Sequence, residues 1–154
     1  LREPSKITPG PEGSWPLRFD RLIQPVLDTQ CVRCHNPKGE DALAAKYDLT
    51  PDHAYDALTL YGKPSLLDQV LLAYREGVST EGKNPAQTSA LLALLNAPDG
   101  HAGVKLDRDS LDRFVTWLDT YGQRQGSFSE AQEQRLMALR DELTATVWND
   151  PPAK

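Results

Sequence analysis

The chain has 154 residues, enough for one domain with its own hydrophobic core, and its 39% hydrophobic and 25% charged residues are typical of a globular protein. The net charge is −5 without any basic run, so a nucleic-acid partner is not expected. No apolar run approaches the roughly 18 residues that span a bilayer, so no transmembrane segment is expected either. The chain starts at Leu1 without a signal-peptide pattern, so we expect a processed form or a fragment.

The first part of the chain predicts an arm followed by a helix. Residues 1–16 are rich in Pro, Gly and Ser and predict a linker or an extended arm. Residues 17–30 carry Leu22, Ile23, Val26 and Leu27 at helical spacing and run directly into Cys31. Because Pro25 lies inside this segment, we expect the helix to start late or to kink there.

The middle of the chain predicts a long loop and then a helix. Residues 36–64 contain several Pro and Gly turn signals and leave room for one short helix at Asp52–Leu60. Loops of this length in a compact domain usually wrap a ligand or carry function. A helix follows over residues 64–77, with Ser65 at its start and Gly77 as its stop signal.

Two further helices are predicted before residue 123. The first covers residues 84–96, with Asn84 as N-cap and Pro85 at the first helical position. After the loop "APDGHAGVKL", the second helix presents an apolar stripe and ends at Gly122; its stripe is Leu111, Phe114, Val115 and Leu118.

A last helix is predicted over residues 129–148, with Ser129 as N-cap and an apolar stripe of Leu136, Leu139, Leu143 and Val147. Residues 149–154 predict a loose tail. No strand alternation persists anywhere in the sequence. The expected fold class is therefore all-α, with a main helical domain over residues 17–128 and an additional C-terminal helix.

The stretch "QCVRCHN" holds both cysteines of the chain, Cys31 and Cys34, with His35 directly after them. Cys-x-x-Cys-His is the attachment signature of c-type haem. Two thiols at this spacing can reach two vinyl groups of one porphyrin, and the adjacent histidine can place a nitrogen under the iron. Haem c is therefore the predicted cofactor, with its iron as the predicted metal.

Three other chemistries compete for the same motif. A zinc site would need a fourth ligand from His53 or His101, and the chain has no second ligand pair. A thioredoxin-like dithiol would lie in a βαβ pattern, which is missing from the sequence. A disulfide across two residues would close a very small loop and add little stability.

The haem motif at the end of an amphipathic helix, "VLDTQCVRCH", resembles the first helix of a monohaem cytochrome c domain. The segment "DRDSLDRFVTWLDTYG" resembles the helix that crosses it in that fold. More narrowly, "GHAGVKLDRDSLDRFVTWLD" resembles cytochrome c domains of large bacterial periplasmic proteins, the haem domain of the hydrazine synthase alpha subunit among them. The resemblance covers roughly residues 17–128 and implies a cytochrome c-like domain over that range. It does not imply hydrazine synthesis, because such domains are attached to many proteins.

The sixth ligand of the iron has three candidates besides a lysine, water or nothing. His101 lies in a loop where the resembled domains place a distal ligand, and is the preferred candidate, which implies bis-histidine, low-spin ligation. His53 follows a helix-start signal and is more typical of a surface residue or a propionate partner. Met137 has charged and amide neighbours on its own helical face, which predicts an exposed or edge-packing methionine. The resemblance also implies that Trp117 lies against the haem or against the first helix, so it is a candidate haem neighbour.

The preferred functional hypothesis is electron transfer through one haem c, as a module of a larger redox protein or as the carrier for a redox partner. The net negative charge fits salt-sensitive docking on a positive partner. The alternative hypothesis is a haem enzyme or small-ligand sensor whose sixth site is open or displaceable. The resemblance implies attachment of haem outside the cytoplasm, so a periplasmic or otherwise outward-facing location is expected.

Overall fold

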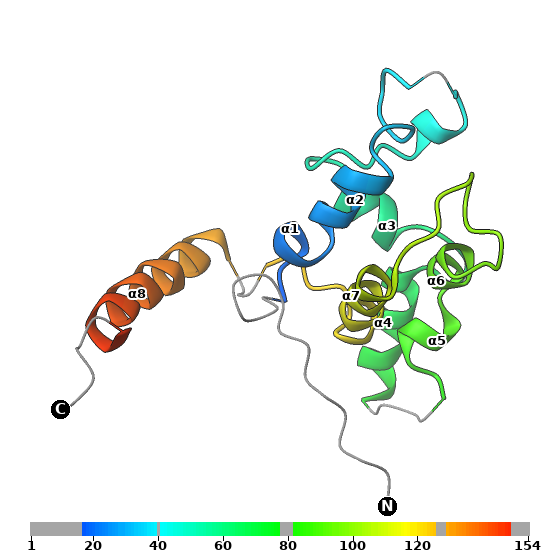
Figure 1. The fold of residues 1–154 in the computed structure, drawn as a ribbon. Helices are drawn as coiled ribbons and strands as arrows, with labels where there is room; N and C mark the ends of the chain where they lie inside the picture. The colour runs from blue at the N-terminus through cyan, green and yellow to red at the C-terminus, as the bar shows by residue number, and fades with distance from the viewer. Residues whose placement is uncertain (1–16, 40, 78–81, 126–128, 149–154) are drawn as a thin grey trace, which may run out of the picture. The chain divides into compact units, whose positions relative to one another are not determined.

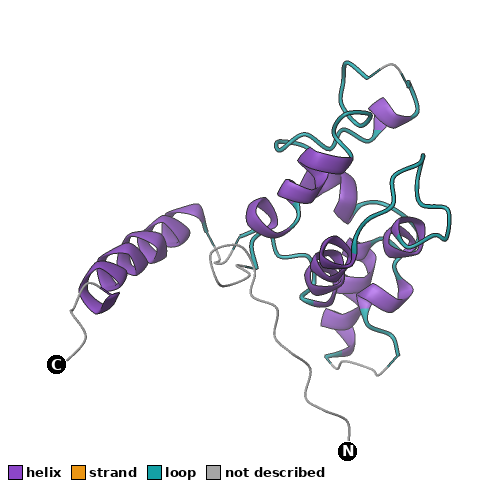
Figure 2. Ribbon diagram, viewed as in Figure 1, coloured by secondary structure: helices purple, strands orange, loops and turns teal. Residues whose placement is uncertain are grey.

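The computed structural model describes residues 17–39, 41–77, 82–125 and 129–148. Its elements in chain order are α1 (Phe19–Leu22), α2 (Gln24–Gln30), the 3₁₀ helix η2 (Ala44–Lys46), α3 (Ala54–Thr59), α4 (Leu66–Glu76), α5 (Pro85–Thr88), α6 (Ala90–Leu95), α7 (Arg108–Asp119) and α8 (Glu130–Trp148). Over the described ranges there is no strand, only one isolated bridge between His101 and Val104 (Figure 2). The predicted all-α class is confirmed. The predicted arm and loose tail lie outside the described residues.

The chain divides into two compact units, Leu1–Arg124 and Gln125–Lys154. The second unit contains α8, whose start agrees with the sequence: Ser129 Oγ accepts a hydrogen bond from the Gln132 amide at 3.2 Å. Three leucines of its predicted apolar stripe are about half exposed, namely Leu136, Leu139 and Leu143. The side chain of Val147, the fourth, lies outside what the structure describes. None of the described helices is both long enough and apolar enough to cross a membrane.

The predicted helix break near Pro25 is confirmed. α1 ends and α2 begins at Ile23, and Pro25 occupies the first turn of α2. Proline has no amide hydrogen, and its ring clashes with the carbonyl four residues earlier, so a continuous helix through this point is unfavourable. In the first turn of a new helix the missing donor would have had no partner anyway.

The hydrophobic core of the first unit is built mainly by residues of the segment that contains α1 and α2 and by residues of α7. Phe19, Leu22, Ile23 and Leu27 are at most 4% exposed, and Phe114, Trp117 and Leu118 of α7 at most 1%. The Phe19 and Trp117 rings lie 5.4 Å apart between centroids. In Figure 1, α7 lies between α1 and the short helices α5 and α6, and it packs against all three. Because α1 contacts both α7 and α2, these contacts help to position α2 and the motif that follows it.

The predicted helix over residues 84–96 is two short helices. The backbone at Ser89 is extended, and the Ser89 hydroxyl accepts a hydrogen bond from the Leu92 amide at 3.3 Å, capping α6. Asn84 is the N-cap residue of α5, as predicted, but its side chain makes no capping hydrogen bond. Asp119 replaces it: its carboxylate accepts from the Ala86 amide at 2.9 Å and from Asn84 Nδ2. A residue on α7 therefore caps α5.

The end of α7 is a Schellman motif. The Gly122 amide donates to the Trp117 carbonyl at 2.8 Å, and the Tyr121 amide donates to the Leu118 carbonyl at 2.9 Å. Tyr121 and Gly122 both have positive φ, 61° and 65°. Gly122 has a second reason to be glycine, because a Cβ there would lie 2.5 Å from Leu66 Cδ2. The predicted helix end at Gly122 is thus confirmed. The backbone at Gly122 packs closely against Leu66 at the start of α4.

The hydrogen bonds at the start of α4 should make the stability of the fold depend on pH. The Asp68 carboxylate accepts from the amide and hydroxyl of Ser65, both at 2.9 Å, and these bonds hold the pKa of Asp68 below its ordinary value of 3.8. A lowered carboxylate pKa stabilises the folded state above the unfolded pKa, and this contribution is lost as pH falls through the folded value. We expect Asp68→Asn to lower the melting temperature at pH 7, and the difference from the wild type to shrink below pH 3.8. A difference that grows on acidification would contradict this reading.

Candidate functional site

The Cys-x-x-Cys-His motif forms a helical turn directly after α2. The Cys31 amide still donates to Leu27 O at 2.8 Å, and the His35 amide donates to Cys31 O at 2.9 Å. Asn36 closes the turn through Nδ2, which donates to the Val32 carbonyl at 2.7 Å. The motif is therefore an ordered continuation of the helix, with backbone bonds that define the positions of both cysteines and the histidine.

Both cysteines are free thiols, Cys31 half-buried and Cys34 exposed. Burial, with a smaller contribution from the neighbouring Cys34, raises the pKa of the Cys31 thiol to about 11. Nucleophilic and redox-active cysteines have the opposite property, a lowered pKa in an electropositive setting. At neutral pH Cys31 is protonated, which does not favour the thioredoxin-like chemistry considered for this motif.

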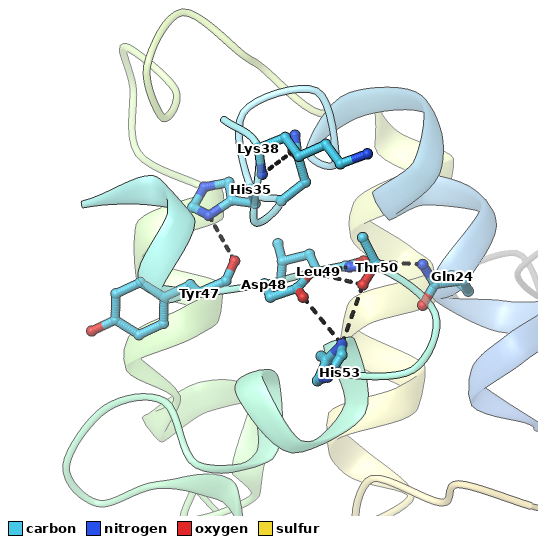
Figure 3. Close-up of polar contacts among 9 residues, drawn as sticks. Gln24, His35, Lys38, Tyr47, Asp48, Leu49, Thr50 and His53 are labelled. Atoms are coloured by element: carbon cyan, nitrogen blue, oxygen red, sulfur yellow. Dashed lines mark hydrogen bonds and ion pairs between the residues drawn. The ribbon is translucent and has the colours of Figure 1, made fainter. Parts of the chain in front are cut away.

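The ring of His35 is held by backbone carbonyls. Its Nδ1 lies 3.0 Å from Ala44 O and 3.1 Å from Tyr47 O, and Figure 3 shows the bond to Tyr47. A carbonyl oxygen can only accept a hydrogen bond, so Nδ1 must carry the proton and donate it. In the neutral ring Nε2 then keeps its lone pair. A metal-ligating histidine shows this arrangement, with one nitrogen free and the other donating to a carbonyl.

His101 is carried by a tight turn between α6 and α7. The His101 amide donates to Val104 O at 2.9 Å, and the Val104 amide returns a bond to His101 O at 2.8 Å. The two residues between them, Ala102 and Gly103, both have positive φ, which matches the type I′ turn of a two-residue hairpin. Left-handed backbone at an alanine costs about 1–2 kcal/mol. The loop therefore holds His101 in a defined place.

Gly100 allows a direct test of this loop. Its φ is +71°, and a Cβ would lie 2.3 Å from Val104 O. Gly103 has a similar φ of +79° but open space around its Cβ position, so it is a matched control. We expect Gly103→Ala to cost about 1–2 kcal/mol of unfolding free energy, from backbone strain alone, and Gly100→Ala to cost clearly more. Chemical denaturation of both variants measures the difference, and equal losses would show that the close approach at Gly100 is unimportant.

The structure brings His35 and His101 together. Their ring centroids lie 5.8 Å apart and the ring planes differ by 29°. Both line one pocket of about 380 Å³, within the range of ligand sites, and its wall also includes Cys31, Cys34, Leu43, Ala44, Leu95, Val104 and Leu106. Its wall is formed by the end of α2 with the loop that follows, drawn in blue to cyan in Figure 1, and by the end of α6 with the yellow-green loop before α7. Leu43 and Tyr47, both in its wall, are 70% and 46% exposed.

The separation of the two rings can be compared with that of two imidazoles bound to one metal ion. A metal–nitrogen bond of about 2 Å, with ring nitrogens about 1 Å from the ring centre, places two imidazoles on one ion about 6 Å apart. The 5.8 Å separation of His35 and His101 is close to this value. Nowhere in the described residues, this pocket included, do three His, Cys, Asp or Glu side chains form a group that could hold a metal ion by themselves. A haem iron takes four ligands from its porphyrin and needs only one or two from the protein.

The structure places His53 away from this pocket. Its side chain is 65% exposed, and its Nδ1 lies 3.1 Å from Asp48 Oδ2 and 3.4 Å from Thr50 Oγ1 (Figure 3). The bonds from Thr50, together with the neighbouring His53, lower the pKa of Asp48 against a raising effect of burial. His53 is thus a surface residue beside the N-terminus of α3. This agrees with the sequence, where its position after a helix-start signal is more typical of a surface residue than of a ligand.

Trp117 and Met137 are not among the residues that line the pocket. Trp117 is completely buried, and its Nε1 donates to the Gln123 carbonyl at 3.2 Å. Its ring packs against Phe19 and Tyr55, so its place is in the core between α1 and α7. Met137 is half-buried on α8, in the second unit, which is described by itself.

Several residues of the site escape sequence reasoning. The acceptors for His35 Nδ1 are backbone carbonyls, of Ala44 and Tyr47, and any residue type can supply a carbonyl. The Leu49 amide donates to His35 O at 3.0 Å. This contact is also unpredictable from the sequence, because both of its atoms belong to the backbone. The only available signal in the sequence is the length of the loop after the motif. A loop of this length indicates that it encloses a ligand or carries function, but it does not identify the contacting atoms.

Comparisons of the sequence with protein-family models and with curated proteins, and of the structure with solved structures, find no match. The features of this chain that indicate a function are therefore the Cys-x-x-Cys-His motif and the pocket beside it.

Proposed function

We propose that this chain is an electron-transfer domain that holds one c-type haem covalently between His35 and His101. The observation that carries the proposal is the pairing of these two imidazoles across an apolar pocket whose wall also contains both thiols of the Cys-x-x-Cys-His motif. A bound haem iron would carry single electrons by changing between Fe(III) and Fe(II).

Each residue of the pocket has a defined task in this proposal. Cys31 and Cys34 would hold the porphyrin covalently, each thiol adding its S–H across one vinyl double bond to give a thioether. His35 would offer Nε2 to the iron while its Nδ1–H donates to the Ala44 and Tyr47 carbonyls. His101 would offer the second imidazole from its hairpin. Two imidazole ligands favour Fe(III) and a lower reduction potential than a histidine and a methionine would.

The apolar wall supports the same proposal. Leu43 and Tyr47 leave large parts of their side chains exposed beside the pocket, although Tyr47 also packs against Tyr61 at 5.7 Å between ring centroids. Exposed apolar side chains around a hollow are typical of a surface that a ligand covers. Their burial by a flat, largely apolar cofactor would contribute about 25 cal/mol for each Å² removed from water.

Redox titration of the haem-loaded protein tests the proposed function. We expect a reversible one-electron transition and low-spin absorption in both oxidation states. Carbon monoxide should leave the reduced spectrum unchanged, because His101 fills the remaining site. Strong carbon monoxide binding by the wild type would overturn the electron-transfer proposal and favour the alternative, a haem enzyme or sensor with an open site.

A further inference from the structure

A short segment, residues 47–50, holds His35 from two sides, and we call it the strap. Its Tyr47 carbonyl accepts from His35 Nδ1 at 3.1 Å, and its Leu49 amide donates to His35 O at 3.0 Å. The ring and the backbone of the same histidine are therefore tied to one stretch of chain. The strap therefore supplies one of the two carbonyls that orient the His35 ring, and the other, Ala44 O at 3.0 Å from Nδ1, lies just before it in the chain.

Gln24 anchors the strap to α2. Its Nε2 donates to the Leu49 carbonyl at 3.1 Å and to Asp28 Oδ1 at 2.8 Å, and Figure 3 shows Gln24 beside Leu49 and Thr50. Both partners are acceptors, so the assignment of nitrogen and oxygen in the amide is unambiguous. The bond to Leu49 is buried, and it joins residues 25 positions apart in the sequence.

The burial of Gln24 is unfavourable by itself. The residue is 5% exposed, and its Oε1 has no hydrogen-bond partner in the part of the chain that the structure describes. A buried acceptor without a partner loses its hydration and gains nothing in return. An apolar side chain would pack at this position without that cost, so the tie to Leu49 is the feature that only glutamine supplies here.

We propose that Gln24 is a positioning residue for His35, acting through the Leu49 carbonyl on the strap whose Tyr47 carbonyl accepts the His35 Nδ1–H bond. Gln24 touches neither the pocket nor any reacting atom. A hydrogen bond from Nδ1–H to a carbonyl makes Nε2 a stronger donor, and a stronger donor stabilises Fe(III). Loosening the strap should therefore raise the reduction potential, an expectation that rests on the proposed function.

The test compares Gln24→Leu with two matched variants. Asp28→Ala removes the other partner of the Gln24 amide but leaves its bond to Leu49. Val26→Ala removes buried packing from the same helix, at a side chain that is 6% exposed, without touching the strap. ¹⁵N NMR of the chain as purified gives the tautomer and the Nδ1 proton exchange of His35, and redox titration of the haem-loaded protein gives the potential.

We expect only Gln24→Leu to speed exchange of the His35 Nδ1 proton and to raise the potential. Gln24→Leu with wild-type exchange and potential would overturn the inference, and so would equal shifts in Val26→Ala, which would reveal a general loss of packing. A chain that carries no haem would contradict the proposed function alone, because the His35 proton still reports on the strap. Faster exchange with an unchanged potential would overturn the electronic part of the inference.

Discussion

Replacing His101 by alanine should convert a low-spin haem protein into one that is high-spin and binds carbon monoxide. The residue supplies one of the two imidazoles whose centroids lie 5.8 Å apart, and nothing on the adjacent hairpin replaces it, since Ala102 and Gly103 carry no ligand. The haem should stay attached, because the proposed thioether bonds are made by Cys31 and Cys34. Absorption and EPR spectra, with and without carbon monoxide, measure the change.

The matched control for this variant is His53→Ala. His53 is an exposed histidine that pairs with Asp48 and lies outside the pocket wall, so its loss should leave the spin state unchanged. Met137→Ala serves the same purpose for the thioether alternative. A low-spin spectrum that persists in His101→Ala and disappears in either control would show that the sixth ligand was assigned to the wrong residue.

Trp117→Ala should produce the largest loss of stability among single substitutions in the first unit. The side chain is completely buried, packs against the Phe19 and Tyr55 rings, and donates from Nε1 to Gln123 O. Removing a buried tryptophan costs about 3–5 kcal/mol, against a total stability of about 5–15 kcal/mol for a typical domain. Denaturant unfolding measures the free energy directly.

Two comparisons make the tryptophan result specific. Tyr74→Ala removes an aromatic side chain that is 86% exposed, and it should change the unfolding free energy by no more than about 0.5 kcal/mol. The resemblance to cytochromes c implies that Trp117 lies against the haem or against the first helix, and the structure shows it packed against Phe19 of α1. A Trp117→Ala variant with near wild-type stability and a changed haem spectrum would support the haem contact against the core role described here.

The fold was predictable wherever a local rule acts alone. Pro25 indicates a helix break because its effect operates within one turn, and Gly77 indicates a helix end because its left-handed backbone is a local property. Prediction failed where a distant residue decides. Asn84 occupies the N-cap position of α5, but the acceptor for the Ala86 amide is the Asp119 carboxylate on α7, which also binds the Asn84 side-chain amide. No periodicity in residues 84–96 indicates a partner 33 residues away.

In the candidate site, too, features set by local sequence were predictable and features set by distant contacts were not. His35 is visible in the sequence because the haem motif has a defined spacing, and His101 is proposed because it lies in a loop just before α7. The Tyr47 carbonyl, the Leu49 amide and Gln24 carry no such signal, since two are backbone groups and the third resembles any helical glutamine. Their roles depend on the path of the loop after the motif, which is a tertiary property.

The central claim is that Cys31 and Cys34 hold a haem covalently, and the mass of the intact, unfolded chain tests it most directly. After expression with a haem-attachment system outside the cytoplasm, the wild type should carry the added mass of one haem and keep its haem absorption through denaturation. A double variant, Cys31→Ser with Cys34→Ser, should have the mass of the bare chain. A wild-type chain that loses all haem on unfolding, or never gains its mass, would contradict the account.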